Sequence, residues 1–266
     1  MTSYVIIPSL CINPLKYYVL PMTADTMHII DHKERNAKKV EQMFSKIAER
    51  YDLLNHVLSL GLDILWRKRV AQETGNINCH RILDVCTGTG DMAIELCKFW
   101  KGRADIEGID FSRELIEIGR KKVGKANLKD KITFREGNAE KLPYENEQFN
   151  AVTITFGLRN IKNRLKALKE FYRVASPGGC FVCLEFSQPA NPVFSKIYFF
   201  YLTRLAPFIS KLLGSDPAAY QYLGNSIKDF PSPSELINLI ESAGWKDVTY
   251  RKLAGGIVAL HRGIKD

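Results

Sequence analysis

The sequence has no uninterrupted apolar run close to the roughly 20 residues that a membrane-spanning helix needs. Residues 1–30 are apolar and aromatic, but Pro8, Pro14 and Pro21 interrupt them and Lys16 adds a charge. A secretory signal would need a basic start and a continuous apolar core, and this segment has neither. We therefore expect residues 1–30 to form a poorly ordered tail, and we assign no function to it.

Groups that could bind a metal ion are also scarce. The chain has six cysteines, and no second cysteine pair or histidine cluster accompanies Cys180 and Cys183. These two have C-x-x-C spacing within a strand pattern, where residues three apart face opposite sides of the sheet. The sequence therefore predicts no metal site. Cysteines in apolar patterns pack as free thiols, which favours a reducing, cytoplasmic compartment.

Acidic residues are in the minority, with 29 against 38 basic residues and a net charge of +9. A basic surface attracts nucleic acid or anionic lipid head groups. Because the lysines are spread over many segments, a generally basic solvated surface explains the same balance. Length and composition otherwise fit one large soluble α/β domain with additions.

A glycine-containing loop lacks the lysine of a phosphate-binding P-loop. The apolar run at 81–86 leads into Gly88 and Gly90, and a helical pattern follows at once. This order is typical of a nucleotide-type pocket at the carboxyl edge of a parallel sheet. Ala93 is tolerated in place of a third glycine, so the loop alone does not exclude a dinucleotide. Asp84 favours the cationic S-adenosylmethionine, and the remaining alternative is a plain turn that needs glycine.

Two further strand ends carry residues suited to a nucleoside. Asp110 closes an apolar run at 105–110, and its carboxylate can accept hydrogen bonds from both ribose hydroxyls; Phe111 follows it and joins the predicted cofactor set. Asn138 offers a donor and an acceptor for an adenine edge, and the small Ala139 lets the backbone approach the ring. A ligand-free Gly-Asn turn is the alternative.

The loop after the fourth strand pattern, 149–156, lacks the Asn/Asp-Pro-Pro-aromatic motif of enzymes that methylate base amines. It also lacks a cysteine nucleophile for pyrimidine methylation. Arg159 stands there instead, and a guanidinium near a phenol or enol oxygen favours the anion. The ortho carbon of such an anion attacks a sulfonium methyl group. The alternative is that Arg159 pairs with a structural acid.

Strand and helix patterns alternate with short loops, which predicts an α/β fold with a mostly parallel seven-stranded sheet and a terminal antiparallel hairpin. This is the Rossmann-like layout of a class I S-adenosylmethionine-dependent methyltransferase. We expect a single domain over 31–266, with N-terminal helices at 38–72. The expected strands are 81–86, 105–110, 131–136, 149–156, 179–186, 246–253 and 256–263, and the expected helices are 91–100, 112–123, 163–174 and 233–243.

An insertion at 187–232 is rich in apolar and aromatic residues, with Lys196, Arg204 and Lys211 interleaved and Pro207 interrupting it. One interpretation is a pair of core helices that cover the sheet edge. The other is an apolar lid over a hydrophobic substrate, with the basic residues at lipid head groups. Ordinary loops are much shorter, which favours a functional role.

Longer motifs run through the chain: Arg81-Ile82-Leu83-Asp84-Val85, Phe156-Gly157-Leu158-Arg159-Asn160, Leu184-Glu185-Phe186-Ser187 and Gly255-Gly256-Ile257-Val258-Ala259. From residue 33 onward the chain resembles the ubiquinone/menaquinone biosynthesis C-methyltransferases. The resemblance implies S-adenosylmethionine-dependent methylation of a ring carbon in a prenylated quinol such as demethylmenaquinol. It implies cofactor contacts at the glycine loop and at Thr89, Asp110, Asn138 and Ala139, and at Thr155, where the family usually has serine.

The same resemblance suggests how the substrate is held. Tyr51 and Asn55 would close the pocket, Arg159 would orient and activate the quinol oxygen with Asn160 beside it, and aromatic residues of 194–208, including Tyr198 and Tyr201, would bind the isoprenoid tail. We expect a soluble protein at the inner membrane face, where it would meet such a substrate. Nucleic acid is not an expected partner, and a homodimer is compatible with the sequence. A nucleic-acid methyltransferase and a non-catalytic cofactor-binding subunit are the alternatives. Asp63-Ile64 departs from the His-Arg pair of many relatives.

Overall fold

The computed structural model describes residues 4–7, 18–21, 52, 56–57, 59–75, 79–212 and 218–266. The chain divides into two compact units, Met1–Gln42 and Met43–Asp266. In the first unit, β1 (Tyr4–Ile7) pairs antiparallel with β2 (Tyr18–Pro21). The expected tail at 1–30 and the domain limits remain predictions.

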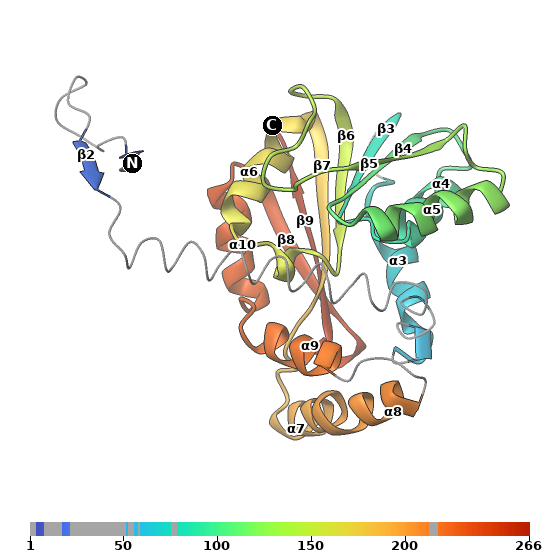
Figure 1. The fold of residues 1–266 in the computed structure, drawn as a ribbon, viewed down its shortest axis with the longest axis vertical. Coiled ribbons are helices and arrows are strands. Elements are labelled where there is room, and N and C mark those ends of the chain that lie inside the picture. Colours follow the sequence, from blue (N-terminus) through green and yellow to red (C-terminus); the bar gives the residue numbers. More distant parts are fainter. Residues whose placement is uncertain are drawn as a thin grey trace. The chain divides into compact units, whose positions relative to one another are not determined.

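The second unit is built on a seven-stranded sheet with the order β5-β4-β3-β6-β7-β9-β8 (Figure 1). β3 to β7 run parallel, and β9 pairs antiparallel with both β7 and β8. The prediction of a mostly parallel sheet with a terminal antiparallel hairpin is confirmed. The strands are β3 (Arg81–Val85), β4 (Asp105–Asp110), β5 (Ile132–Glu136), β6 (Phe149–Thr155), β7 (Ala175–Phe186), β8 (Lys246–Leu253) and β9 (Val258–Ile264).

Helices cover both faces of this sheet. Figure 1 shows α4 (Asp91–Phe99) and α5 (Arg113–Lys125) on one side and α6 (Arg164–Val174) and α10 (Pro233–Ser242) on the other. α3 (Leu62–Glu73) precedes the first strand of the sheet, and Trp66 and Val70 pack in the same core as α4.

Two hydrophobic cores follow from the alternation of side chains along each strand. Phe181 and Cys183 lie in the core under α6 and α10, whereas Cys180 and Val182 lie in the core under α3 and α4. Cys180 and Cys183 therefore face opposite sides of the sheet, as their spacing in a strand predicts.

The insertion after β7 forms a separate layer of helices, drawn in yellow-orange to orange at the lower end of Figure 1. Tyr198, Leu202 and Ile227 form its small core, which packs against Phe186 and Ile257 of the main unit. None of the helices in the described part of the chain is both long and apolar enough to cross a membrane. The helices are α7 (Pro192–Phe200), a π-helical segment η3 (Tyr201–Leu205), α8 (Ala206–Leu212) and α9 (Ala218–Lys228), and short 3-10 turns lie at η2 (Leu158–Asn160) and η4 (Ala254–Gly256).

Candidate active site

The glycine loop between β3 and α4 fixes the carboxylate of Asp110. The backbone N–H of Gly88 donates to Asp110 Oδ2 at 2.8 Å, and that of Ser112 donates to Oδ1 at 3.0 Å. Burial raises the pKa of Asp110, and these two hydrogen bonds oppose the rise. Gly88 has φ +56°, and a Cβ there would meet nothing within 4 Å. The loop therefore holds an oriented carboxylate beside open space, which suits a ribose.

Asp84 lies at the end of β3 and is buried. Thr87 Oγ1 donates to its Oδ2 at 2.6 Å, and Thr153 Oγ1 of β6 donates to its Oδ1 at 2.8 Å. Burial raises the pKa of Asp84 to about 6. Both carboxylate oxygens thus brace the loop against the neighbouring strand, and direct contact between Asp84 and a cofactor stays a prediction.

The predicted adenine residues lie at the next strand ends of the sheet. The N–H of Gly137 donates to the carbonyl of Asp110 at 2.9 Å, which brings the Asn138 turn beside that strand end. Asn138 is exposed, and its Oδ1 accepts from the N–H of Glu140. Phe111 is partly exposed directly after Asp110. The structure therefore brings the predicted cofactor residues to one edge.

The end of β6 is shaped by an unusual backbone. Phe156 has φ +59°, a region that bulky residues rarely adopt. Gly157 follows, and a Cβ there would lie 2.5 Å from Cys86 Cβ, so only glycine fits. The hydroxyl of Thr155 is buried and has no hydrogen-bond partner in the described ranges. Buried polar groups are normally satisfied, so this hydroxyl is available to a ligand.

Arg159, on η2, forms a buried ion pair with Glu185 at the end of β7. Arg159 Nη1 lies 2.8 Å from Glu185 Oε1, and the N–H of Arg159 donates to Oε2 at 3.1 Å. The guanidinium also donates to the carbonyl of Phe156 and lies 5.4 Å from the ring centroid of Phe186. Arg159 therefore pairs with an acid, and its contact with a substrate oxygen stays a prediction.

Tyrosines from the insertion contact the residues that follow Arg159 and Glu185 in the chain. Tyr222 donates to Asn160 Oδ1 at 3.0 Å. Tyr198 is buried, and its hydroxyl has no hydrogen-bond partner within the described part of the chain. The cluster that contains Tyr198 packs against Phe186, the ring over which the guanidinium of Arg159 lies. Burial raises the pKa of Tyr198, and the charge of Arg159 opposes the rise. Tyr201 is half-buried on η3.

Tyr222 and Glu185 were not among the site residues predicted from sequence. Glu185 stands inside the Leu-Glu-Phe-Ser motif that carried the resemblance, so that motif was a signal for it. Tyr222 had none. The predicted Tyr51 and Asn55 lie outside the described residues.

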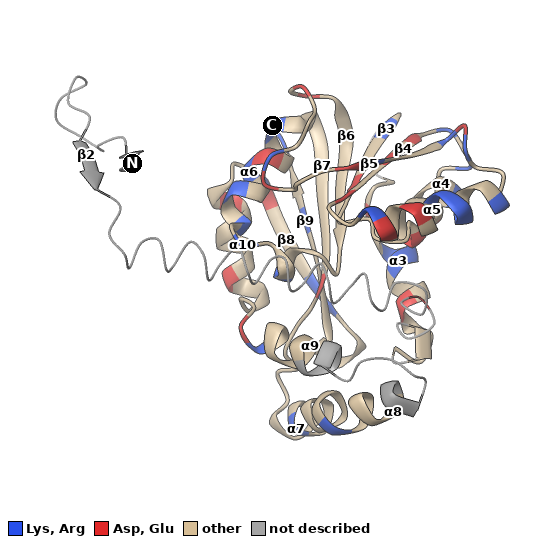
Figure 2. Cartoon of the chain, viewed as in Figure 1, with Lys and Arg blue, Asp and Glu red and all other residues tan. Residues whose placement is uncertain are grey.

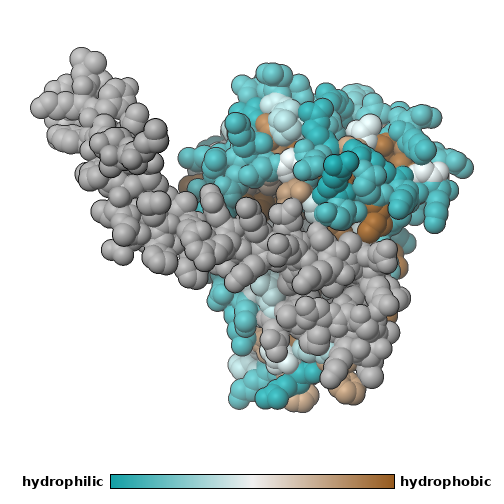
Figure 3. Space-filling view, in the orientation of Figure 1, coloured by the Kyte–Doolittle hydropathy of each residue, from teal (hydrophilic) through white to brown (hydrophobic). Residues whose placement is uncertain are grey.

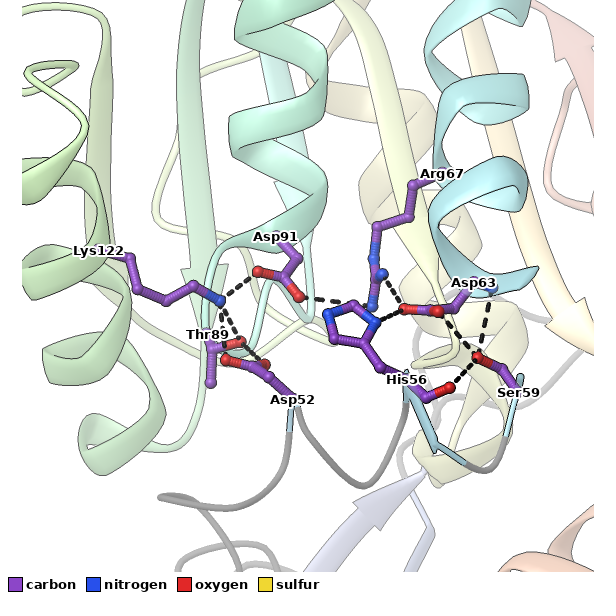
Figure 4. A network of polar contacts seen from close by, with 8 residues as sticks. All are labelled: Asp52, His56, Ser59, Asp63, Arg67, Thr89, Asp91 and Lys122. Atoms are coloured by element: carbon purple, nitrogen blue, oxygen red, sulfur yellow. Dashed lines mark hydrogen bonds and ion pairs between the residues drawn. The ribbon is translucent and has the colours of Figure 1, made fainter. Parts of the chain in front are cut away.

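A polar network connects the chain before α3 to the glycine loop (Figure 4). Thr89 Oγ1 donates to Asp52 Oδ1 at 2.6 Å, and Lys122 Nζ of α5 donates to Asp52 Oδ2 at 2.8 Å. Lys122 also pairs with Asp91 at the start of α4. Figure 4 shows the charges alternating along this row, so each carboxylate faces a cation.

Asp63 is the other centre of this network. Its carboxylate lies 2.7 Å from His56 Nδ1 and 2.5 Å from Arg67 Nη1, and it accepts from Ser59 Oγ at 2.8 Å. Burial opposes the charge of Asp63, but the hydrogen bonds from His56, Ser59 and Arg67 together lower its pKa. Arg67 continues to Asp91 at 3.7 Å. Asp63 therefore pairs with His56 and Arg67 of its own segment.

These residues fit S-adenosylmethionine. Asp110 offers an oriented carboxylate to ribose hydroxyls, Gly88 leaves room above the loop, and Thr155 has an unsatisfied buried hydroxyl. The carboxylates of Asp84 and Asp110 give this edge a negative potential, which suits a sulfonium and an ammonium group better than a pyrophosphate.

Comparison with known proteins agrees with this geometry. The model of the ubiE/COQ5 methyltransferase family matches residues 32–265. The chain is 42% identical over 228 residues to the ubiquinone/menaquinone biosynthesis C-methyltransferase UbiE of Geobacter sp. (strain M21), covering 86% of this chain and 97% of the relative. It is 39% identical over 231 residues to the demethylmenaquinone methyltransferase of Staphylococcus aureus (strain JH9), covering 87% and 95%.

Solved structures share the fold at much lower sequence identity. A SAM-dependent methyltransferase from Aquifex aeolicus has a TM-score of 0.56 at 19% identity, covering 75% of this chain and 89% of that one. The [4+2]-cyclase SpnF has a TM-score of 0.63 at 16% identity, covering 86% and 96%. The fold therefore hosts more than one kind of chemistry, and the site must identify the reaction.

Proposed function

This chain belongs to the ubiE/COQ5 methyltransferase family, and from that premise we propose that it transfers a methyl group from S-adenosylmethionine to a ring carbon of a prenylated quinol, converting demethylmenaquinol to menaquinol. Family membership favours this substrate over the nucleic acid that net charge alone allowed. A buried ion pair of a guanidinium and a carboxylate beside the predicted cofactor edge is the observation that carries the proposal.

In this proposal the cofactor lies along the edge formed by the ends of β3, β4, β5 and β6. Asp110 would bind the ribose hydroxyls, Asn138 and Ala139 the adenine, and Thr155 a polar atom near the methionyl portion. Gly88, Thr89 and Gly90 would lie under the cofactor, with Asp84 bracing them from below. When bound, S-adenosylmethionine supplies an electrophilic methyl carbon on a positively charged sulfur.

Arg159 orients the quinol and stabilises negative charge on its oxygen. Glu185 neutralises part of the charge of Arg159 and fixes its guanidinium. Arg159 therefore contributes more by orienting the quinol, and less by its charge, than an unpaired guanidinium would. Asn160, held by Tyr222, lies next in the chain to Arg159 and offers an amide to the same region. The ring carbon that gains the methyl group loses its proton, and the sulfur keeps the electron pair of the broken bond.

Tyr198 of the insertion has a buried hydroxyl without a hydrogen-bond partner among the described residues. Its unsatisfied phenol would donate a hydrogen bond to a quinol oxygen, while Tyr201 would contact the first part of the isoprenoid tail. The substrate is a lipid, so the proposal includes peripheral contact with the inner membrane face. The observation that supports this contact is the exposed apolar surface of the insertion helices.

A direct assay tests the function. The protein is incubated with methyl-labelled cofactor and with demethylated naphthoquinol or benzoquinol, each reduced and oxidised, and the new carbon–methyl bond is located by mass spectrometry. We expect label on the ring of the reduced naphthoquinol. Cofactor binding without label on any quinol contradicts the proposal and favours a non-catalytic cofactor-binding subunit.

A further inference from the structure

The insertion helices α7, η3 and α8 are apolar on two opposite sides. On the inner side, Tyr198, Leu202 and Ala206 are buried. On the outer side, Phe200 and Phe208 are 65% and 59% exposed, so they cannot line an internal pocket. A helix that is apolar on all sides lies either in a large core or against lipid. We define the outer face by its exposed residues Val193, Lys196, Ile197, Phe200, Arg204, Leu205 and Phe208.

The charges of the outer face have one sign. Residues 187–212 contain the bases Lys196, Arg204 and Lys211 and no aspartate or glutamate. Figure 2 accordingly shows blue and no red along the described part of α7, η3 and α8. Lys228 of α9 adds a base at the side, with Nζ 5.2 Å from the ring centroid of Phe199. Apolar and hydrophilic surface lie next to each other at the lower end of Figure 3, where Figure 1 places α7.

These charges decide which occupant fits the outer face. In a twofold dimer the same patch meets itself, so the bases of one copy would face the bases of the other. An anionic bilayer offers the complementary combination, with acyl chains for the phenylalanines and head groups for the bases. Lys and Arg side chains can keep their charge in water while their stems lie along apolar surface.

We propose that the outer face docks on an anionic lipid bilayer. The same helix that would enter the interface with Phe200 carries the buried Tyr198 on its inner side, in the cluster that packs against Phe186 beside Arg159. Docking there would bring the insertion next to the acyl region, so that a quinol reaches the ion pair without crossing water. This role rests on the proposed function, but docking itself is measurable without turnover.

Vesicle binding tests the proposal directly. The full chain is sedimented with vesicles of phosphatidylcholine alone or with added phosphatidylglycerol. We expect the wild type to bind the anionic vesicles. The affinity should fall about tenfold or more in Phe200→Ser/Phe208→Ser, and about fivefold for each base removed in Lys196→Gln/Arg204→Gln. Phe200→Leu/Phe208→Leu, which keeps apolar area, and Lys121→Gln/Lys125→Gln, which removes two exposed bases of α5, should bind like the wild type.

A comparison of two substrates separates this proposal from the proposed function. The serine and glutamine variants should keep wild-type turnover on a short-chain, water-soluble quinol and lose turnover on a long-chain quinol in vesicles. Wild-type vesicle binding by Phe200→Ser/Phe208→Ser overturns the docking proposal, as does loss of self-association in that variant with vesicle binding unchanged. A wild-type protein that methylates neither quinol refutes the proposed function instead, and the sedimentation result still decides the docking face.

Discussion

The hydroxyl of Thr89 lies 2.6 Å from the carboxylate of Asp52, 37 residues earlier in the chain. Thr89 belongs to the glycine loop, and Asp52 belongs to the segment before α3, so the bond closes that segment onto the loop. Lys122 fixes Asp52 from the other side at 2.8 Å. Because Thr89 is also a predicted cofactor contact, the cofactor and the N-terminal segment would be linked through a single hydroxyl.

This link predicts weaker cofactor binding when Asp52 is changed. In Asp52→Asn the ion pair with Lys122 is lost, and the loop is held less firmly. Both side chains are about a quarter exposed (26% and 29%), so solvent screens the pair. We expect a loss of roughly 1 kcal/mol, or about fivefold in Kd, by titration calorimetry with S-adenosylhomocysteine. The control is Lys121→Gln, which removes the exposed base that precedes Lys122. An unchanged Kd for Asp52→Asn would show that the segment before α3 does not support the glycine loop.

Arg159 should affect turnover more than cofactor binding. Arg159→Ala would leave Glu185 buried without its cation, at a cost of about 3 kcal/mol or more in folding stability. Arg159→Lys keeps the charge but replaces the planar guanidinium, which lies over the ring of Phe186, by a compact ammonium. We expect its kcat to fall at least about tenfold with the Kd for cofactor unchanged.

The contrast with Asp110 makes the Arg159 experiment decisive. Asp110→Ala should weaken cofactor binding first, because this carboxylate is the predicted ribose ligand. Arg173→Lys, in a pair with Glu170 on α6, controls for loss of a guanidinium elsewhere. If Arg159→Lys lost cofactor affinity and turnover to the same extent, its assignment to the quinol would be wrong.

The sheet was predictable because each parallel strand repeats the same local pattern of an apolar run, a turn and a helix. The limits of the strands were harder to predict. β7 begins at Ala175 and not at 179 as expected, since Pro177 and Gly178 interrupt the apolar pattern from which the strand was predicted. The bulge between Phe149 and Ala151 in the pairing of β6 with β7 accommodates that irregular stretch.

The location of Asp110 and Asn138 at one edge of the sheet was predictable, because each lies at or just after the end of a strand pattern in the sequence. The partner of Arg159 was not, because an alternating pattern gives the face of Glu185 but not which neighbour it meets across strands. Thr89, Asp52 and Lys122 lie on three separate segments of the chain. Only the tertiary fold brings such residues together.

Asp84 predicts a specific dependence of stability on pH. Burial raises its pKa from 3.8 to about 6, so the folded state holds this proton more tightly than the unfolded chain. The contribution of Asp84 to stability is therefore full below pH 3.8 and is lost as the pH rises toward 6, by about 3 kcal/mol at most. The difference in unfolding free energy between Asp84→Asn and the wild type, measured in urea from pH 4 to 7, should change in favour of the variant as the pH rises. A difference that stays constant with pH would show that Asp84 titrates at its ordinary pKa.

The contact between Gly157 and Cys86 predicts a rescue. In Gly157→Ala the new Cβ would lie 2.5 Å from Cys86 Cβ, which is too close for two carbon atoms. Both residues lie just after strands of the sheet, so we expect the loop before Arg159 to shift. We expect a loss of about 1–3 kcal/mol in stability and a larger loss in turnover, because the shift displaces η2. Cys86 has φ +54°, which glycine adopts without strain, so Cys86→Gly removes both the clash and the unfavourable backbone.

The double variant Gly157→Ala/Cys86→Gly should therefore recover most of the stability that Gly157→Ala loses, with a coupling energy of about 1 kcal/mol or more in a double-mutant cycle. Gly157 has φ −110°, so alanine adds no positive-φ strain there. The control is Gly224→Ala on α9, where a Cβ would meet only Thr203 Cγ2 at 3.5 Å, an ordinary contact. Additive effects of the two substitutions would mean that the clash with Cys86 is relieved elsewhere. In that case the geometry of the β6 end would depend on the strained Phe156 and not on the contact between the two loops.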